Sequence, residues 1–260
     1  MGRDGDAGVD GPRAVAVNVA ANTTLPGLRG PVFPDRSFAY LPIPEREPTD
    51  EWVPTYADLI DRIDLHRPLP DELLDRRVHL DPAFAGYPHC ETYTYGDEHG
   101  VKARPLAALE PGDYALFYAT LTRVTGVTGY DPTVPPEWGA FLIGGFRLSR
   151  VVTGEAFAES TPEERHPFRE NAHLRRETVD AEVFLAGDPD GSTLFDRAVS
   201  LSAPDAGATA GEVVTGLSTD SGRGPWWRRP LRFDREAAAA LLDRLPELDD
   251  GEKPDAPTGN

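Results

Sequence analysis

Two runs of aromatic and branched apolar residues, at 112–119 and 139–152, constrain the fold more than any other part of the chain. The first run is Gly-Asp-Tyr-Ala-Leu-Phe-Tyr-Ala, and neither of its alternating faces is polar. A strand with two apolar faces has to be covered on both sides. The second run contains Gly144-Gly145, and paired glycines inside a strand are typical of a bulge or of a close approach by another backbone or a ligand. We therefore predict that these two strands form the centre of a sheet.

Shorter predicted elements surround these two strands. Buried or alternating apolar residues predict strands over 14–20, 91–97 and 179–186. Capping residues and helical spacing predict short helices over 55–63, 70–77 and 192–201, another from Thr161, and a last one from Asp234 to about residue 245. Many short strands with a few short helices indicate an α+β fold, in which peripheral short helices surround a small mixed or antiparallel β-barrel-like sheet.

Two loop regions and both ends of the chain complete the predicted organisation. Residues 31–45 place prolines among aromatic side chains and are predicted to be a stiff, extended edge segment. Residues 120–138 are predicted to be a lid, a binding loop or an insertion, because loops of this length are usually functional. The glycine- and aspartate-rich residues 1–12 and the tail at 246–260 are predicted to be disordered.

The charge of the chain is strongly unbalanced. Asp and Glu number 44 and Lys and Arg number 26, which gives a formal net charge of −18, and Lys102 and Lys253 are the only lysines. An acidic chain with so little lysine resembles proteins of extreme halophiles. Such a charge opposes nucleic-acid binding at low salt, but at roughly 1 M salt charges are screened within about 3 Å. The net charge therefore neither predicts nor excludes a nucleic-acid partner.

Other bulk features bound the location and the redox chemistry. No apolar run reaches membrane-spanning length, and the acidic, glycine-rich N-terminus does not resemble a signal peptide. We therefore expect a soluble, cytoplasmic protein that has no membrane partner. The single cysteine, Cys90, excludes an internal disulfide and a cysteine-built zinc site, and we expect its thiol to be buried.

A series of short motifs follows one another along residues 13–204. In chain order they are Phe33-Pro-Asp-Arg-Ser-Phe38, Leu41-Pro-Ile-Pro-Glu45, His79-Leu-Asp-Pro82, Thr94-Tyr-Gly-Asp97, Gly112-Asp-Tyr-Ala-Leu-Phe-Tyr118 and Asn171-Ala-His173. This order resembles the nucleotide modification associated domain family of the third type, which occurs in phage and prokaryotic gene sets linked to hypermodified or restricted DNA. The resemblance implies such a domain over 13–204. It also implies that the partner is a nucleotide or a modified nucleic-acid base, with DNA as one form, alongside proteins of a DNA modification system.

The chain departs from this family in two places, and one of its strands also resembles a second group of proteins. The first predicted strand ends in Ala-Ala-Asn, whereas relatives have an acidic and glycine-rich turn. The Trp226-Trp227-Arg228-Arg229 region lies outside the resemblance, and residues 205–245, which contain it and the last predicted helix, are predicted to be a C-terminal extension. The strand at 112–118 also resembles one in modified-base-binding barrels of the PUA and EVE kind, which implies a PUA-like sheet.

Carboxylate and imidazole side chains in these motifs are candidates for acid–base catalysis. His79 and Asp81 are two residues apart, so both point to one side if the segment is extended. The two could share a metal ion, the carboxylate could orient the imidazole, or both could be ordinary structural groups before a proline turn. No metal-ligand spacing joins these residues, so we assign no metal site and leave the cofactor open. The predicted catalytic set is His79, Asp81, Asp35, Glu45 and His173.

Aromatic, amide and guanidinium side chains are candidates for binding a base or nucleotide. Aromatic rings stack on bases, amides pair with base edges and arginines contact phosphates. The alternative for the aromatic residues is that they seal the edge of a hydrophobic core. The predicted base- or nucleotide-binding set is Asn22, Phe38, Tyr40, Tyr118, Asn171, Arg228 and Arg229.

Three functions remain open, in this order of preference. The first is a nucleotide- or modified-base-binding domain that works with DNA base hypermodification or restriction. The second is an enzyme of the same pathway, a base transferase or hydrolase, which requires the five predicted catalytic residues to share one cleft. The third is a scaffold in a modification complex, with an aromatic interface near Trp226.

Overall fold

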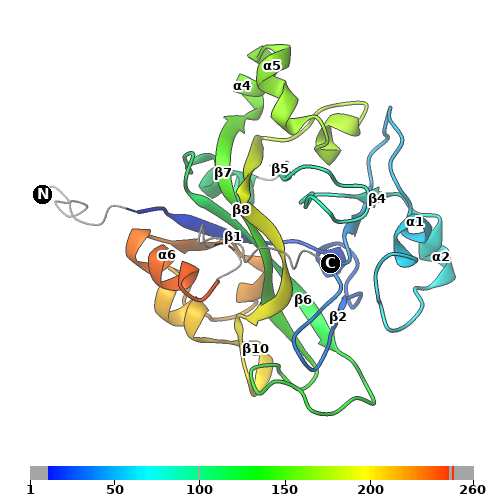
Figure 1. Cartoon of the computed structure of the whole chain (residues 1–260), viewed down its shortest axis with the longest axis vertical. Helices are drawn as coiled ribbons and strands as arrows, with labels where there is room; N and C mark the ends of the chain where they lie inside the picture. The colour runs from blue at the N-terminus through cyan, green and yellow to red at the C-terminus, as the bar shows by residue number, and fades with distance from the viewer. Residues whose placement is uncertain (1–10, 99, 246–247, 249–260) are drawn as a thin grey trace, which may run out of the picture.

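The computed structural model describes residues 11–98, 100–245 and 248, which form a curled mixed sheet with short helices around it (Figure 1). The principal sheet has seven strands in the order β11-β1-β6-β7-β8-β5, and β2 pairs with β6 beside this path. β1 and β2 run parallel to β6, and the other neighbours are antiparallel. The strands are β1 (Ala14–Asn18), β2 (Pro31–Val32), β5 (Thr94–Asp97), β6 (Tyr114–Arg123), β7 (Trp138–Thr153), β8 (Val183–Ser200) and β11 (Leu231–Phe233).

Two short β-ribbons and a set of short helices complete the fold, so the α+β class is confirmed. In the ribbons, β3 (Ile43–Pro44) pairs with β4 (Val78–His79), and β9 (Ser202–Ala203) pairs with β10 (Ala206–Ala210). The α-helices are α1 (Tyr56–Ile60), α2 (Asp71–Leu74), α3 (Gly100–Ala107), α4 (Gly154–Glu159), α5 (Pro162–Arg165) and α6 (Arg235–Leu242). The 3-10 helices are η1 (Ala21–Thr23), η2 (His166–Phe168), η3 (Ala172–Arg175) and η5 (Trp226–Arg228), and η4 (Val213–Leu217) is a π-helix.

The centre of the sheet is the predicted pair of strands, β6 and β7. β6 is buried along both faces from Tyr114 to Leu121, as its two apolar faces require. The register of β7 shifts against both β6 and β8 next to Ile143, so the predicted bulge beside the glycine pair is confirmed. A Cβ on Gly144 would lie 2.6 Å from the ring of Phe84, so the glycine allows this ring to pack directly on the strand.

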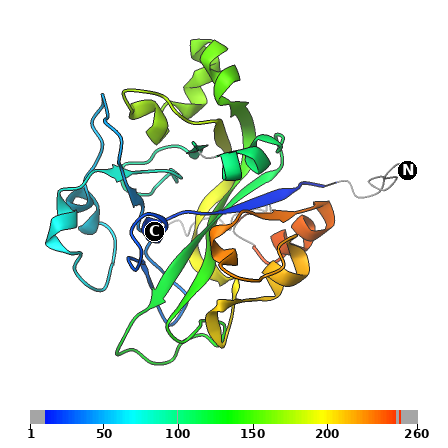
Figure 2. The same ribbon diagram turned by 180° about the vertical axis from the view of Figure 1, so that it is seen from behind.

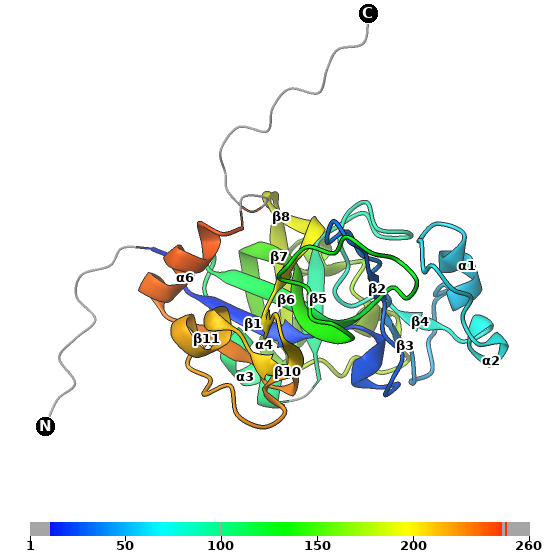
Figure 3. The same ribbon diagram turned by 90° about the horizontal axis from the view of Figure 1, so that it is seen from below.

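Each face of the sheet carries its own hydrophobic core. The first core contains Phe84, Phe117 and Phe146 and lies on the side of α1 and α2, whereas the second contains Trp226 and lies under β11 and α6 (Figure 3). β1 crosses the molecule beside the β11 and α6 segment (Figure 2). Much of the segment predicted as an extension, 205–245, therefore contributes to the second core and to the edge of the sheet.

One predicted element is wrong, and several are shorter than expected. Residues 192–200 of the predicted helix over 192–201 belong to β8. Several register shifts of this long strand against β7 break the two-residue alternation and imitate helical spacing. β6 continues to Arg123, so the long connection between the central strands begins only after it. Within the described residues the two end strands of the sheet, β11 and β5, do not pair with each other, so the sheet is a half-barrel. The PUA likeness stays a prediction.

The two predicted disordered ends lie almost entirely outside the described residues. Of 1–12 only residues 11 and 12 are described, and of 246–260 only Leu248. None of the described helices combines the length and the apolar character needed to cross a membrane.

Candidate functional site

Buried ionisable side chains from three separate segments meet beside β5. The β3–β4 ribbon pairs Ile43 with His79, and the backbone N–H of Glu45 donates to the carbonyl of Arg77, so Glu45 and His79 lie next to each other. Asp81 follows β4 at once, and η3 carries His173. His79, Asp81 and His173 are 2%, 5% and 3% exposed, which removes them almost entirely from solvent. Burying such groups is unfavourable unless each has a partner, so the contacts among them define the site.

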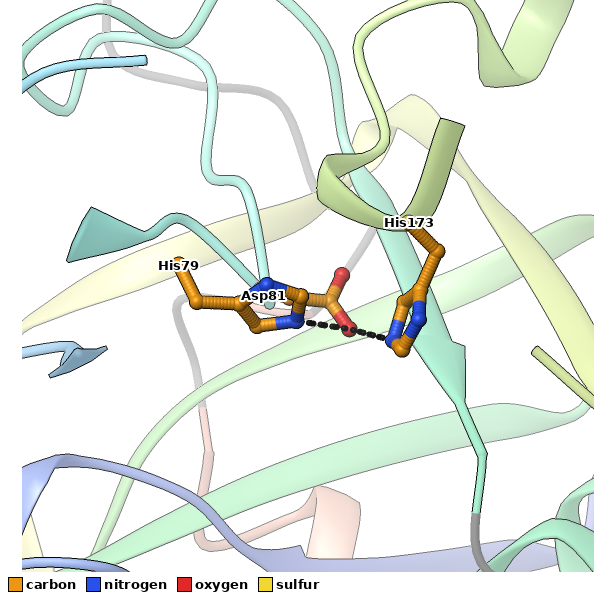
Figure 4. A group of neighbouring side chains, drawn as sticks. All are labelled: His79, Asp81 and His173. Carbon is orange, nitrogen blue, oxygen red and sulfur yellow. Dashed lines mark ion pairs between the residues drawn. The ribbon is translucent and has the colours of Figure 1, made fainter. Parts of the chain in front are cut away.

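Asp81 is the centre of the site, with one imidazole on either side of its carboxylate (Figure 4). The backbone N–H of Gly96 donates to both of its oxygens, at 3.1 and 2.9 Å, and the amide of Asn171 donates to Oδ1 at 3.0 Å. These donors fix the carboxylate. Its Oδ2 atom lies 3.9 Å from Nε2 of His79 and 3.5 Å from Nε2 of His173.

Each imidazole is held from behind by a second carboxylate. Nδ1 of His79 donates to Oε2 of Glu45 at 2.6 Å, and Nδ1 of His173 donates to Oδ1 of Asp180 at 2.7 Å. An ionised carboxylate can only accept, which places the proton on Nδ1 in both rings. The Nε2 atoms of both rings therefore face Asp81, and the ring centroids lie 4.8 Å apart at an interplanar angle of 87°.

Arg176 joins the two carboxylates behind the imidazoles. Its Nη2 atom lies 3.0 Å from Glu45, and its Nη1 atom donates to Asp180 at 2.6 Å and to Glu98 at 2.5 Å. Burial would raise the pKa of Glu45, but the contacts with His79 and Arg176 hold this pKa well below its ordinary value. Burial would lower the pKa of His173, but the hydrogen bonds to Asp180 and Asp81 raise this pKa to about 9. The site thus favours positive charge between its carboxylates.

A cavity of about 500 Å³ opens onto this cluster. His79, Asp81 and His173 line it together with the end of β1, where Asn18 lies, and the chain around η1. Positive side chains also border it, and the ammonium group of Lys102 on α3 donates to the carbonyl of Asn18 at 3.0 Å. Cavities of this size with a few polar groups are typical of small-molecule sites.

The structure brings together four of the five residues of the predicted catalytic set. Glu45, His79, Asp81 and His173 form the cluster described above, and His79 and His173 lie on the same side of the sheet. Asp35 lies in an exposed turn, where its carboxylate accepts from the Ser37 hydroxyl at 2.6 Å. That turn contacts Ala198 near the end of β8, whereas Gly96 pairs with Phe184 near its start, so Asp35 is remote from the cluster.

The predicted base-binding set is divided more widely. Asn22 and Arg228 line the cavity, and Asn171 supports Asp81 from a fully buried position. The remaining members lie elsewhere. Tyr40 is buried in the first core, and Phe38 packs between the two cores. Tyr118 lies in the second core, where its hydroxyl donates to the carbonyl of Arg229. The guanidinium of Arg229 pairs with Asp220.

Several residues of the site are not in either predicted set. Asn18 ends β1, Lys102 lies on α3, and Arg176 and Asp180 follow η3. A polar residue directly after an apolar strand was a usable signal for Asn18, since ligands bind at strand ends in many sheets. Arg176 and Asp180 belong to a charged run that has the composition of a solvated surface, so their roles depend on tertiary contacts alone.

Comparison with known proteins finds one family. A protein-family model described as nucleotide modification associated domain 3 matches residues 13–243, which is most of the chain and extends past residue 204. No curated protein and no solved structure matches the chain.

Proposed function

The chain belongs to the nucleotide modification associated domain 3 family, and on that premise we propose that it binds a nucleotide or a modified nucleic-acid base in the cavity beside Asp81. The family suggests a role in nucleotide modification systems. The cavity has the size and the polar lining that such a ligand requires.

One side-chain atom carries this proposal. Oδ1 of Asn18 is buried and has no hydrogen-bond partner among the described residues, while Nδ2 of the same amide donates to the carbonyl of Trp227 at 2.5 Å. The Trp227 contact fixes the amide of Asn18, a residue that lines the cavity, and Oδ1 is left as a buried acceptor beside it. A buried acceptor without a donor costs about 1–3 kcal/mol, which a ligand N–H would recover. The exocyclic amine or ring N–H of a base is such a donor.

Positive groups around the cavity fit the phosphate of a nucleotide. Arg46 and Arg228 line the cavity from the η1 and η5 sides, and the guanidinium of Arg46 is anchored by a hydrogen bond to the carbonyl of Thr24. Arginine and lysine are the usual phosphate contacts, through charge-assisted hydrogen bonds. These cations favour a nucleotide over a free base, in a chain whose net charge is −18.

An enzyme acting on the bound base is the second candidate. The observation that favours it is the pair of buried imidazoles on Asp81 at the wall of the same cavity, because acid–base groups with perturbed pKa values in a cleft are typical of active sites. His79, Asp81, Glu45 and His173 would then serve a transferase or hydrolase reaction.

Three further statements are also part of the proposal. They are that the sheet is related to PUA and EVE barrels, that DNA is the natural ligand, and that the acidic surface is an adaptation to brine.

A scaffold role has less support. Trp226, the proposed centre of an aromatic interface, is fully buried in the second core, and its indole N–H donates to the carbonyl of Ala208. An interaction surface would have to use other residues.

Ligand-dependent thermal stability tests the binding proposal. A panel of bases, nucleosides, nucleoside monophosphates and short single-stranded DNA should be screened on chelator-treated protein, in low and in molar potassium chloride. A ligand at 100 times its Kd adds about 2.7 kcal/mol, and each kcal/mol shifts the Tm of a chain of this size by roughly 2–4 °C. A monophosphate should shift the Tm more than its nucleoside. Unchanged Tm values across the whole panel at both salt concentrations would refute binding.

A further inference from the structure

The three groups that meet at the wall of the cavity have the geometry of a metal site. We propose that Nε2 of His79, Oδ2 of Asp81 and Nε2 of His173 together bind one divalent first-row transition-metal ion. These atoms lie within 4.8 Å of one another, and all three residues are buried. The ion would border the cavity to which the proposed function is assigned, but its binding is independent of that function.

The distances suit direct coordination. The Oδ2 atom of Asp81 is 3.9 Å from Nε2 of His79 and 3.5 Å from Nε2 of His173. A tetrahedral ion with bonds of about 2.1 Å separates its ligands by roughly 3.4 Å. These two separations therefore need to shorten by only a few tenths of an ångström, and the separation between the two imidazoles lies within 4.8 Å. Figure 4 shows both rings directed at the carboxylate from opposite sides.

The groups behind the three ligands are those that orient metal ligands. A metal-bound imidazole almost always donates its other N–H to a carboxylate, a carbonyl or water, and here Nδ1 of each ring donates to Glu45 or Asp180. The carboxylate of Asp81 is itself fixed through Oδ1 by Asn171. With the proton of each imidazole on Nδ1, the Nε2 lone pairs face a carboxylate oxygen, and two acceptors that face each other need a proton or a metal ion between them.

The net charge of the cluster also favours a bound cation. Four carboxylates lie within 4 Å of the two imidazoles, those of Glu45, Asp81, Glu98 and Asp180, and Arg176 pairs with all of them except Asp81. With neutral imidazoles, four carboxylates against one guanidinium leave three negative charges. One divalent cation offsets two of them.

The donor set indicates the class of ion. Imidazole and carboxylate ligands suit Zn²⁺, Fe²⁺ and similar ions, and two histidines with one carboxylate leave coordination positions open. The open positions would face the cavity that these residues line. An ion bound there could polarise a ligand or activate a water molecule.

Two other arrangements compete with this one. In the first, a proton on Nε2 of His173 takes the place of the ion, and the cluster is a buried salt bridge. In the second, the ion binds on the other side of His173, where Glu98, His173 and Asp180 also lie close together. Variants separate the three possibilities, because His79 belongs only to the proposed site and Asp180 is a ligand only in the alternative one.

Calorimetric titration tests the proposal. Full-length protein is stripped with a chelator and titrated with ZnCl₂, then separately with CoCl₂, in molar potassium chloride with excess Mg²⁺ to occupy exposed carboxylates. We expect one ion per chain and visible Co²⁺ absorption bands that Zn²⁺ abolishes. His79→Gln and His173→Gln should weaken binding by at least about 100-fold, and Glu45→Gln by about 10–100-fold. His166→Gln, at an exposed histidine outside the cluster, should bind as the wild type does.

The possible outcomes are distinct. Stripped wild-type protein that binds neither Zn²⁺ nor Co²⁺ would overturn the metal site, and this measurement needs no variant to fold. Wild-type affinity in a folded His79→Gln, together with lost binding in Asp180→Asn, would move the ion to the Glu98 side and also overturn it. A nucleotide-dependent Tm shift in the stripped protein would survive either failure, so the proposed function is judged separately.

Discussion

The imidazole rings of His79 and His173 lie 4.8 Å apart at 87°, on either side of Oδ2 of Asp81. One ring comes from a two-residue strand and the other from a 3-10 helix much later in the chain. Each ring is held from behind by its own carboxylate, and Arg176 connects those carboxylates. The relative position of the two rings therefore depends on Glu45, Asp180 and Arg176, and each of these side chains can be removed by a single substitution.

Gly96→Ala should disturb the site while leaving its polar groups in place. A Cβ at this position would lie 2.7 Å from Cδ2 of His173 and 3.1 Å from Oδ1 of Asn171. We expect a loss of stability of about 1–3 kcal/mol from overpacking and a weaker affinity for Zn²⁺, measured by urea unfolding and by calorimetry. Gly216→Ala is the matched control, since its Cβ would make an ordinary contact of 3.5 Å with Glu212. Equal behaviour of the two variants would show that His173 is not held as described.

Arg176→Met should destabilise the protein strongly. The guanidinium is 6% exposed as a side chain, and its loss leaves Glu45 without its cationic partner in a buried position. Breaking a buried ion pair costs about 3–5 kcal/mol, and we expect the lower end because Asp180 and Glu98 are partly exposed. Urea unfolding in chelator-containing buffer measures the change. Arg175→Met, at a neighbour that donates to the carbonyl of Trp52, should cost far less.

Asn18→Ala should reduce ligand binding more than it reduces stability. The variant loses the unpaired acceptor Oδ1 and the hydrogen bond to Trp227, and this bond is worth about 0.5–1.5 kcal/mol. We expect about a tenfold higher Kd for the nucleotide that shifts the Tm of the wild type most, measured by equilibrium dialysis. Thr120→Val provides the control, because Oγ1 of Thr120 is also buried without a partner among the described residues but does not line the cavity. An unchanged Kd in Asn18→Ala would remove Asn18 from the binding site.

Cys90 should resist thiol reagents in the folded protein. Burial raises the pKa of its thiol from 9.0 to about 12, so at pH 8 the thiolate fraction is about 10³-fold below that of an unfolded chain. The raised pKa contributes stability that is complete below pH 9 and is lost as the pH rises towards 12. Reaction with a disulfide reagent, before and after unfolding in urea, measures the first effect, and every signal comes from the single cysteine. Cys90→Ala should remove the corresponding part of the alkaline loss of stability, and rapid reaction of the folded wild type would contradict a buried thiol.

The centre of the fold could be predicted because its signal is local. Alternating apolar faces at 112–119 and a glycine pair at 144–145 predict two covered strands and a bulge, and β6 and β7 have both. The end of β8 could not be predicted in this way. Its apolar side chains at 194, 195, 198 and 199 have helical spacing only because register shifts against β7 interrupt the alternation of a strand.

The candidate site could be predicted only in part, because tertiary contacts between distant segments assemble it. Four acid–base residues lie in short motifs, and the folding of the β3–β4 ribbon against η3 brings them together. Asp35 has the same chemistry, but its turn lies at the other end of β8. Arg176 and Asp180 depend on contacts between segments that composition does not distinguish from surface. The functional roles of all these residues remain predictions.

The hydrogen bond from Asn18 to the carbonyl of Trp227 links two segments that are far apart in the sequence, beside the cavity. Asn18 ends the first strand, and Trp227 belongs to η5 near the C-terminal helix. Because the carbonyl of Trp227 belongs to η5, a displacement of η5 would also move the amide of Asn18. A change at the C-terminal side of the chain would thereby reach the wall of the cavity.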